Sequence, residues 1–155
     1  MAQEIERKFL LHSDQWQETI KKQDYYRQGY LNKAEQCSIR VRIANDKAYL
    51  NIKSATLGIQ RSEYEYEIPM SDANEILNSF SLGPIIEKTR YFVDIGKHTW
   101  EIDVFEGDNK GLVVAEIELE HENEAFERPS WLGDEVSDDP RYYNVCLVTH
   151  PYKDW

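Results

Sequence analysis

Hydrophobic and charged positions alternate along several short segments of this chain. Residues 4–10 place Glu4, Glu6 and Lys8 at alternate positions, with Ile5 and Phe9 between them. Successive side chains of a β-strand point to opposite faces, so the charged residues would share one face and the apolar residues the other. The same alternation recurs in residues 38–43 (SIRVRI), 63–68 (EYEYEI), 87–91 (EKTRY), 100–104 (WEIDV) and 115–120 (AEIELE).

Turn signals between these segments complete the prediction of strands. Asn45-Asp46 and Gly96-Lys97 are short enough to join neighbouring strands as hairpins, whereas residues 54–60, which contain Gly58, predict a longer connection. The pattern predicts eight strands, over residues 3–11, 25–32, 36–44, 47–53, 61–68, 85–94, 98–106 and 112–121.

The intervening stretches predict helices. Ser13 and Ser71 precede two of them as N-caps, and Asp139-Pro140 provides the N-cap and first position of another. The expected elements are helices over residues 14–22, 72–80 and 140–148 and a short turn over 123–127.

Many strands with short connections favour an antiparallel sheet closed into a barrel, in an α+β fold that is mainly β. Helices must bury their apolar stripes against the apolar strand faces, which would leave the charged faces to line the lumen. A sandwich with its charged faces in solvent is the alternative, but surface charges usually mix signs, because neighbours of like sign repel. We therefore expect one domain over residues 1–155: an eight-stranded barrel with a charged lumen and helices packed outside.

Composition narrows the functional classes. The 155 residues carry a net charge of −11, which argues against binding a nucleic-acid backbone. There is no apolar run long enough for a membrane span, and acids at Glu4 and Glu6 argue against a secretory signal. Cys37 and Cys146 match neither a disulfide framework nor a metal motif, so we expect free thiols in a reducing cytoplasm.

The charged faces offer two complementary sets of ligands. Arginine and lysine side chains suit phosphate oxygens, and the basic set is Lys8, Arg40, Arg42, Lys53, Arg61, Lys88 and Arg90. Carboxylates without histidine or cysteine suit Mg²⁺ or Mn²⁺, and the acidic set is Glu4, Glu6, Glu63, Glu65, Glu101, Asp103, Glu116 and Glu118. The sequence contains no phosphate loop, nucleotide fingerprint or Ser-His-Asp arrangement, which leaves metal-assisted attack by water or a substrate hydroxyl.

The ordered set of these motifs resembles a known family. Glu4-x-Glu6-x-Lys8 is similar to the ExExK signature of the CYTH superfamily, the triphosphate tunnel metalloenzymes. The segment Pro140–Asn144 resembles the helix that closes one end of the tunnel. Further matches follow in the family's order: Gln28–Leu31, Arg40 with Arg42, Asn51–Ser54, Arg61-x-Glu63-x-Glu65, Glu87–Tyr91, Glu101-x-Asp103 and Glu116-x-Glu118.

The resemblance implies a tunnel that binds a linear triphosphate through its basic residues and divalent metal through its glutamates. We expect hydrolysis of inorganic triphosphate to pyrophosphate and phosphate with two ions of Mg²⁺ or Mn²⁺. The assigned roles are catalytic for Glu4, Glu6, Lys8 and Lys53, substrate-binding for Lys8, Arg40, Arg42, Lys53, Arg61, Lys88 and Arg90, and metal-binding for Glu4, Glu6, Glu63, Glu65, Asp103, Glu116 and Glu118.

Three alternatives remain open at this point. The same site could serve an adenylate cyclase or a phosphatase of organic triphosphates, although Tyr30, Tyr49 and Trp100, which could stack on a base, are better interpreted as barrel residues. A module that binds polyphosphate or nucleotides without turnover is the non-enzyme alternative. The expected partner is a small triphosphate substrate, with neither nucleic acid nor membrane, and the chain could be a monomer or a homodimer.

Overall fold

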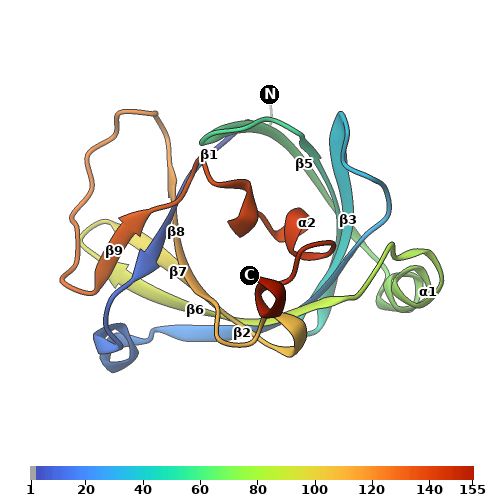
Figure 1. The fold of residues 1–155 in the computed structure, drawn as a ribbon, viewed down its shortest axis with the longest axis horizontal. Coiled ribbons are helices and arrows are strands. Elements are labelled where there is room, and N and C mark those ends of the chain that lie inside the picture. The colour runs from blue at the N-terminus through green and yellow to red at the C-terminus, as the bar shows by residue number, and fades with distance from the viewer. Residues whose placement is uncertain (1–2) are drawn as a thin grey trace.

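A computed structural model describes residues 3–155, which form an antiparallel sheet closed into a ring (Figure 1). The strands are β1 (Gln3–Leu11), β2 (Lys22–Tyr30), β3 (Cys37–Ala44), β4 (Lys47–Ser54), β5 (Gln60–Ile68), β6 (Ile86–Ile95), β7 (His98–Phe105), β8 (Val113–Leu119) and β9 (Leu132–Glu135).

The barrel closes through β1. The strand order is β5-β4-β3-β2-β6-β7-β8-β1-β9, and the first residues of β1, Gln3–Ile5, also pair with β5. The other half of the same edge, at Phe9 and Leu11, pairs with β9. The eight-stranded antiparallel barrel is confirmed, and β9 is an additional strand outside the ring that the sequence did not predict.

Apolar strand faces point outward and are covered by other elements, as predicted. One outer core packs Phe9, Trp100 and Ile117 against Trp131, which precedes β9. Another packs Val41 and other residues of β3 and β4 against the helix α1 (Met70–Phe80). Burial of these apolar surfaces stabilises the fold by roughly 25 cal/mol per Å². Because side chains alternate along a strand, the charged faces then point into the lumen.

The predicted helix over residues 14–22 is wrong except for a short 3₁₀ helix, η1 (Gln15–Thr19). From Lys22 onward the chain belongs to β2 and pairs with β6, Lys22 facing Phe92. Backbone pairing across the sheet outweighs the modest helical preference of these polar residues. The helix predicted over residues 72–80 is confirmed as α1, which begins two residues earlier, after Pro69.

The C-terminal part, residues 136–155, crosses one end of the barrel instead of packing outside it (Figure 1). The predicted helix over 140–148 is interrupted at Tyr143, whose backbone is extended with φ −74° and ψ 132°. Asp139 does cap the first turn, as predicted, by accepting a hydrogen bond from the backbone of Arg141. The remaining short elements are η2 (Gly107–Asn109), η3 (Pro140–Tyr142), α2 (Asn144–Leu147) and η4 (Tyr152–Asp154).

Candidate active site

The register between β1 and β8 brings acidic and basic side chains together inside the barrel. Glu6 lies opposite Glu118, and Lys8 lies opposite Glu116. Residues directly opposite each other in an antiparallel pair project from the same face of the sheet. The lumen therefore contains the charges that the sequence pattern placed on one face of each strand.

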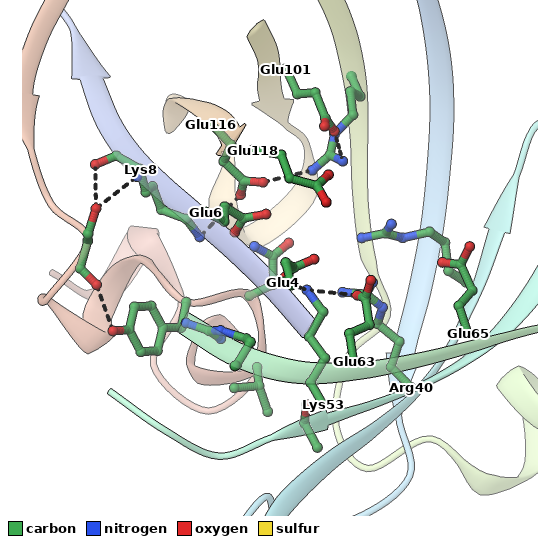
Figure 2. A pocket seen from close by; sticks show the side chains of 18 of the residues that line it. Glu4, Glu6, Lys8, Arg40, Lys53, Glu63, Glu65, Glu101, Glu116 and Glu118 are labelled. Atoms are coloured by element: carbon green, nitrogen blue, oxygen red, sulfur yellow. Dashed lines mark hydrogen bonds and ion pairs between the residues drawn. The ribbon is translucent and has the colours of Figure 1, made fainter. Parts of the chain in front are cut away.

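These faces enclose a cavity of about 260 Å³. Figure 2 shows the side chains of Glu4, Glu6, Glu116 and Glu118 pointing into a common space. Of the site residues predicted from the sequence, all but Asp103 line the cavity: Glu4, Glu6, Lys8, Arg40, Arg42, Lys53, Arg61, Glu63, Glu65, Lys88, Arg90, Glu116 and Glu118.

Burial changes along the cavity and indicates which end is open. Lys88 is fully buried, and Lys8 and Glu116 are nearly so, at the end next to the C-terminal part. Glu65 and Glu118 are exposed. The cavity thus opens at the end away from residues 142–145 and is closed where those residues lie against it.

On one wall, Lys53 of β4 joins two carboxylates. Its ammonium lies 3.1 Å from Glu4 Oε1 and 3.2 Å from Glu63 Oε2. Lys53 faces Glu63 directly across β4 and β5, which explains the second contact. The first contact ties β4 to β1 across the closure of the barrel and holds Lys53 beside the acidic wall.

The deepest contacts centre on Asp103. Its carboxylate accepts hydrogen bonds from Lys88 Nζ at 2.7 Å and from Arg90 Nε and Nη2 at 2.7 and 2.9 Å. Arg90 also pairs with Glu101 and lies 3.3 Å from Glu116. Asp103 is fully buried beside these cations and is not among the residues that line the cavity.

The acidic wall fits a divalent cation by its chemistry. Burial, reinforced by the nearby charge of Glu116, raises the pKa of Glu6 to about 8. A cation among these carboxylates would relieve that repulsion, and a set of oxygen donors suits Mg²⁺ or Mn²⁺. Within residues 3–155, however, no three acidic, histidine or cysteine side chains already stand in a metal-binding arrangement. Glu4 and Glu116 form ion pairs with Lys53 and Lys8 instead.

The opposite wall contains several arginines whose charges are buried and repel one another, and a bound anion would reduce that repulsion. Burial and the charges of Arg40 and Arg90 lower the pKa of Arg42 to about 10. Arg40 is buried, and its Nε has no hydrogen-bond partner within the described residues. Phosphate oxygens would supply both the missing acceptor and the missing negative charge.

The sequence did not identify the side chains that close the cavity. Asn144 Oδ1 accepts hydrogen bonds from Lys88 Nζ at 2.8 Å and from Gln28 Nε2 at 3.0 Å. Lys8 Nζ donates to the backbone oxygen of Tyr142 at 3.1 Å. The Pro140–Asn144 motif pointed to this end of the tunnel, but nothing in its spacing indicates which lysine each residue would meet.

The three aromatic residues considered for stacking on a base lie in different places. Trp100 is fully buried in the outer core, as the barrel interpretation predicted. Tyr30 is also buried, but part of its side chain lines the cavity together with Ser38. Tyr49 belongs to β4 and is not among the residues around the cavity.

Comparison with known proteins agrees with this geometry. Residues 2–143 match the CYTH domain. The chain belongs to the CYTH domain family. An inorganic triphosphatase of Acetivibrio thermocellus is 50% identical over 155 residues, covering all of this chain and 99% of the relative. One of Nitrosomonas europaea is 35% identical over 153 residues, covering 94% of this chain and 96% of the relative.

This CYTH domain also resembles solved structures. The crystal structure of the inorganic triphosphatase NE1496 superimposes with a TM-score of 0.66 at 32% identity, covering 93% of this chain and 96% of the other. Within residues 3–155, no helix is both long and apolar enough to cross a membrane. Both cysteines, Cys37 and Cys146, are free thiols, as predicted.

Proposed function

We propose that this CYTH domain hydrolyses inorganic triphosphate to pyrophosphate and phosphate with the help of divalent metal ions. The observation that carries the proposal is a single cavity inside the barrel whose lining brings arginines and lysines together with carboxylates. The names of the two relatives, both inorganic triphosphatases, support it. The proposed setting is the cytoplasm, as the free cysteines favour.

The proposed roles follow the two walls. Arg40, Arg42, Arg61, Lys88 and Arg90 would bind phosphate oxygens. Metal, when bound, would neutralise phosphate charge and activate the attacking water. The carboxylates that would hold it are Glu4, Glu6, Glu63, Glu65, Glu116 and Glu118.

Two lysines and one aspartate have distinct proposed roles. Lys8 and Lys53 each lie beside a carboxylate of the acidic wall, Glu116 and Glu4 respectively, and would stand near the scissile bond. Asp103 moves from the metal-ligand set to a supporting role, because its oxygens already bind Lys88 and Arg90. Its charge would keep both cations aimed at the substrate.

Two of the alternative functions, the binding module and the cyclase, make different demands on the cavity. A protein built only to hold a polyanion gains nothing from carboxylates beside the anion, since they repel it unless metal intervenes. A cyclase would need a binding pocket for the ribose and the base of its nucleotide substrate. The acid-rich wall therefore favours metal-assisted hydrolysis over simple capture.

The basic wall should control affinity for substrate. We expect alanine at Arg40, Arg42, Lys88 or Arg90 to raise the KM for tripolyphosphate by about tenfold or more, the scale of a lost charge-assisted hydrogen bond. Steady-state kinetics at fixed Mg²⁺ measures this effect. Lys97→Ala, in the exposed turn between β6 and β7, is the control and should behave as wild type. Loss of turnover alone in all four variants would contradict the assignment of this wall to substrate binding.

Inorganic triphosphate should be preferred to ATP. The cavity offers charges and hydrogen bonds along its length, which recognise the phosphate chain and not a group attached to it. We expect kcat/KM for tripolyphosphate to exceed that for ATP by ~10-fold, a difference of ~1.4 kcal/mol. Pyrophosphate should be a poor substrate because it cannot reach both walls. Initial rates with tripolyphosphate, ATP and pyrophosphate at the same metal concentration measure this preference. A preference for ATP with cyclic AMP among the products would indicate a cyclase.

A further inference from the structure

A second chamber, of about 750 Å³, adjoins the closed end of the charged cavity. It lies among the β2–β3 connection, the β4–β5 connection and α2. Its lining is largely apolar and includes Ala55, Leu57, Leu82, Val145 and Val148. This chamber is chemically unlike the cavity beside it, because it contains few groups that could hold a phosphate chain.

The two spaces meet at a shared set of side chains. Tyr30, Ser38, Arg61, Tyr143 and Val145 line both the charged cavity and the apolar chamber. Tyr143 lies at the point where the predicted C-terminal helix is interrupted. The interruption of the helix therefore coincides with the boundary between the two spaces.

Three residues, Gly58, Arg61 and Tyr143, form a closed set of contacts at this boundary, which we call the latch. The Tyr143 hydroxyl accepts a hydrogen bond from Gly58 N at 3.3 Å. Arg61 Nη2 donates to Gly58 O at 3.1 Å, and its guanidinium carbon lies 5.3 Å from the centre of the Tyr143 ring. Both backbone polar groups of Gly58, its N–H and its C=O, thus have hydrogen-bond partners within the latch.

Two members of the latch, Tyr143 and Gly58, are also constrained by features outside it. The Tyr143 hydroxyl donates to Ser137 O at 2.7 Å, which ties it to the segment after β9. Its ring lies 5.7 Å from Lys8 Nζ, so the same side chain contacts a proposed catalytic residue. Gly58 has φ +103°, a backbone conformation that residues with a Cβ rarely adopt. A glycine therefore lets the β4–β5 connection reach Tyr143 without the backbone strain that a residue with a Cβ would introduce.

We propose that Tyr143 is a specificity-determining residue, which keeps the apolar chamber shut off from the bound phosphate chain. The inference rests on the proposed function. An organic group bonded to one end of a triphosphate would gain apolar contacts in the chamber if the latch were open. With the latch closed, that group finds no such contacts, and the bare inorganic chain is favoured.

The chemistry of the chamber identifies the occupant that it would accept. Because the chamber shares lining residues with the arginine-lined cavity, a group that entered it past an open latch would remain attached to a phosphate chain in that cavity. Its apolar lining suits a flat organic ring, such as a nucleobase, better than further phosphates. The predicted occupant is therefore the organic end of a nucleoside triphosphate.

Two variants are expected to weaken the latch, one by a change at Tyr143 and the other by a change at Gly58. Tyr143→Phe keeps the ring beside Arg61 and Lys8 but removes the hydroxyl that bonds Gly58 and Ser137. Gly58→Ala disturbs the loop through its positive φ and leaves Tyr143 in place. Tyr66→Phe, on the outer face of β5 with 57% of its surface exposed, is the matched control for loss of a phenol.

The measurement is kcat/KM for ATP and for tripolyphosphate at the same Mg²⁺ concentration, with thermal unfolding to verify folding. In both latch variants we expect the ratio of ATP to tripolyphosphate to rise about tenfold, the upper end of what one neutral hydrogen bond is worth. The change should come mainly from a lower KM for ATP, and Tyr66→Phe should leave the ratio at the wild-type value. An unchanged ratio in whichever latch variant is folded, or an equal loss of activity on both substrates, would overturn the proposal.

A binding measurement separates failure of this inference from failure of the proposed function. If the wild-type protein does not hydrolyse tripolyphosphate, the proposed function is wrong. The latch is then tested through the dissociation constants of the imido analogues of ATP and of tripolyphosphate, which resist cleavage. The same rise in relative affinity for the ATP analogue is expected in Tyr143→Phe, and equal dissociation constants in wild type and variant would contradict it.

Discussion

Tripolyphosphate hydrolysis should fall to background in excess EDTA and return when Mg²⁺ or Mn²⁺ is added. The reason lies in the acidic wall, where Glu4, Glu6, Glu116 and Glu118 point into a common space and would repel a triphosphate carrying the same sign of charge. A divalent cation held by these carboxylates would offset their negative charge and so allow a triphosphate to bind beside them. Phosphate release measured across a metal titration tests the expectation.

A second readout makes the metal prediction independent of turnover. Because carboxylates that repel one another are brought closer by folding, metal bound only to the folded state should raise the melting temperature in the absence of substrate. NaCl at matched ionic strength is the control, since general screening would also weaken repulsion. Full turnover in excess EDTA, with no stabilisation by Mg²⁺ or Mn²⁺, would mean that the carboxylates serve another purpose.

The second large effect concerns β1. We expect Glu4→Gln or Glu6→Gln to lower kcat for tripolyphosphate by at least ~10²-fold, the usual scale for losing a metal ligand or a general base. Folding should survive, because glutamine keeps the shape of the side chain and removes a charge from an acidic cluster. Steady-state kinetics and thermal unfolding on the same preparations measure the two quantities.

Glu67→Gln is the matched control for these variants. Glu67 continues the row of Glu63 and Glu65 on β5, but it is exposed and is not among the residues around the cavity. Its replacement should leave kcat unchanged. Wild-type kcat in both Glu4→Gln and Glu6→Gln would show that the β1 carboxylates take no part in the reaction, whatever the position of the cavity.

The face that each strand turns toward the lumen could be predicted from the sequence because it depends on a local regularity. Alternation places Glu4, Glu6 and Lys8 on one face of β1 whatever the rest of the chain does. Because residues of like charge share these strand faces, the sequence favoured faces that line a lumen over faces that are exposed to solvent. The cavity lining agrees with that prediction at every assigned position except Asp103.

The pairing of individual charges depends on contacts between distant parts of the chain. Asp103 occupies a position on β7 that faces the lumen in the alternating pattern. Its carboxylate is nevertheless surrounded by Lys88 and Arg90 of the neighbouring strand β6. Which side chain lies behind which is set by the register of β6 with β7 and by how far each side chain reaches. Neither property appears in a single segment, so the pairing of Asp103 with Lys88 and Arg90 could not be predicted from the sequence alone.

The ends of the chain show the same division between local and long-range causes. The capping of η3 by Asp139 could be predicted, since a cap needs only the adjacent residues. The break at Tyr143 could not, because its partners Gly58 and Lys8 lie far away in the sequence. Strand identity, charged faces and family membership were thus determined by the sequence. The closure of β1 on β5, the extra strand β9 and the latch were decided by the tertiary structure, since each depends on contacts between segments that meet only after folding.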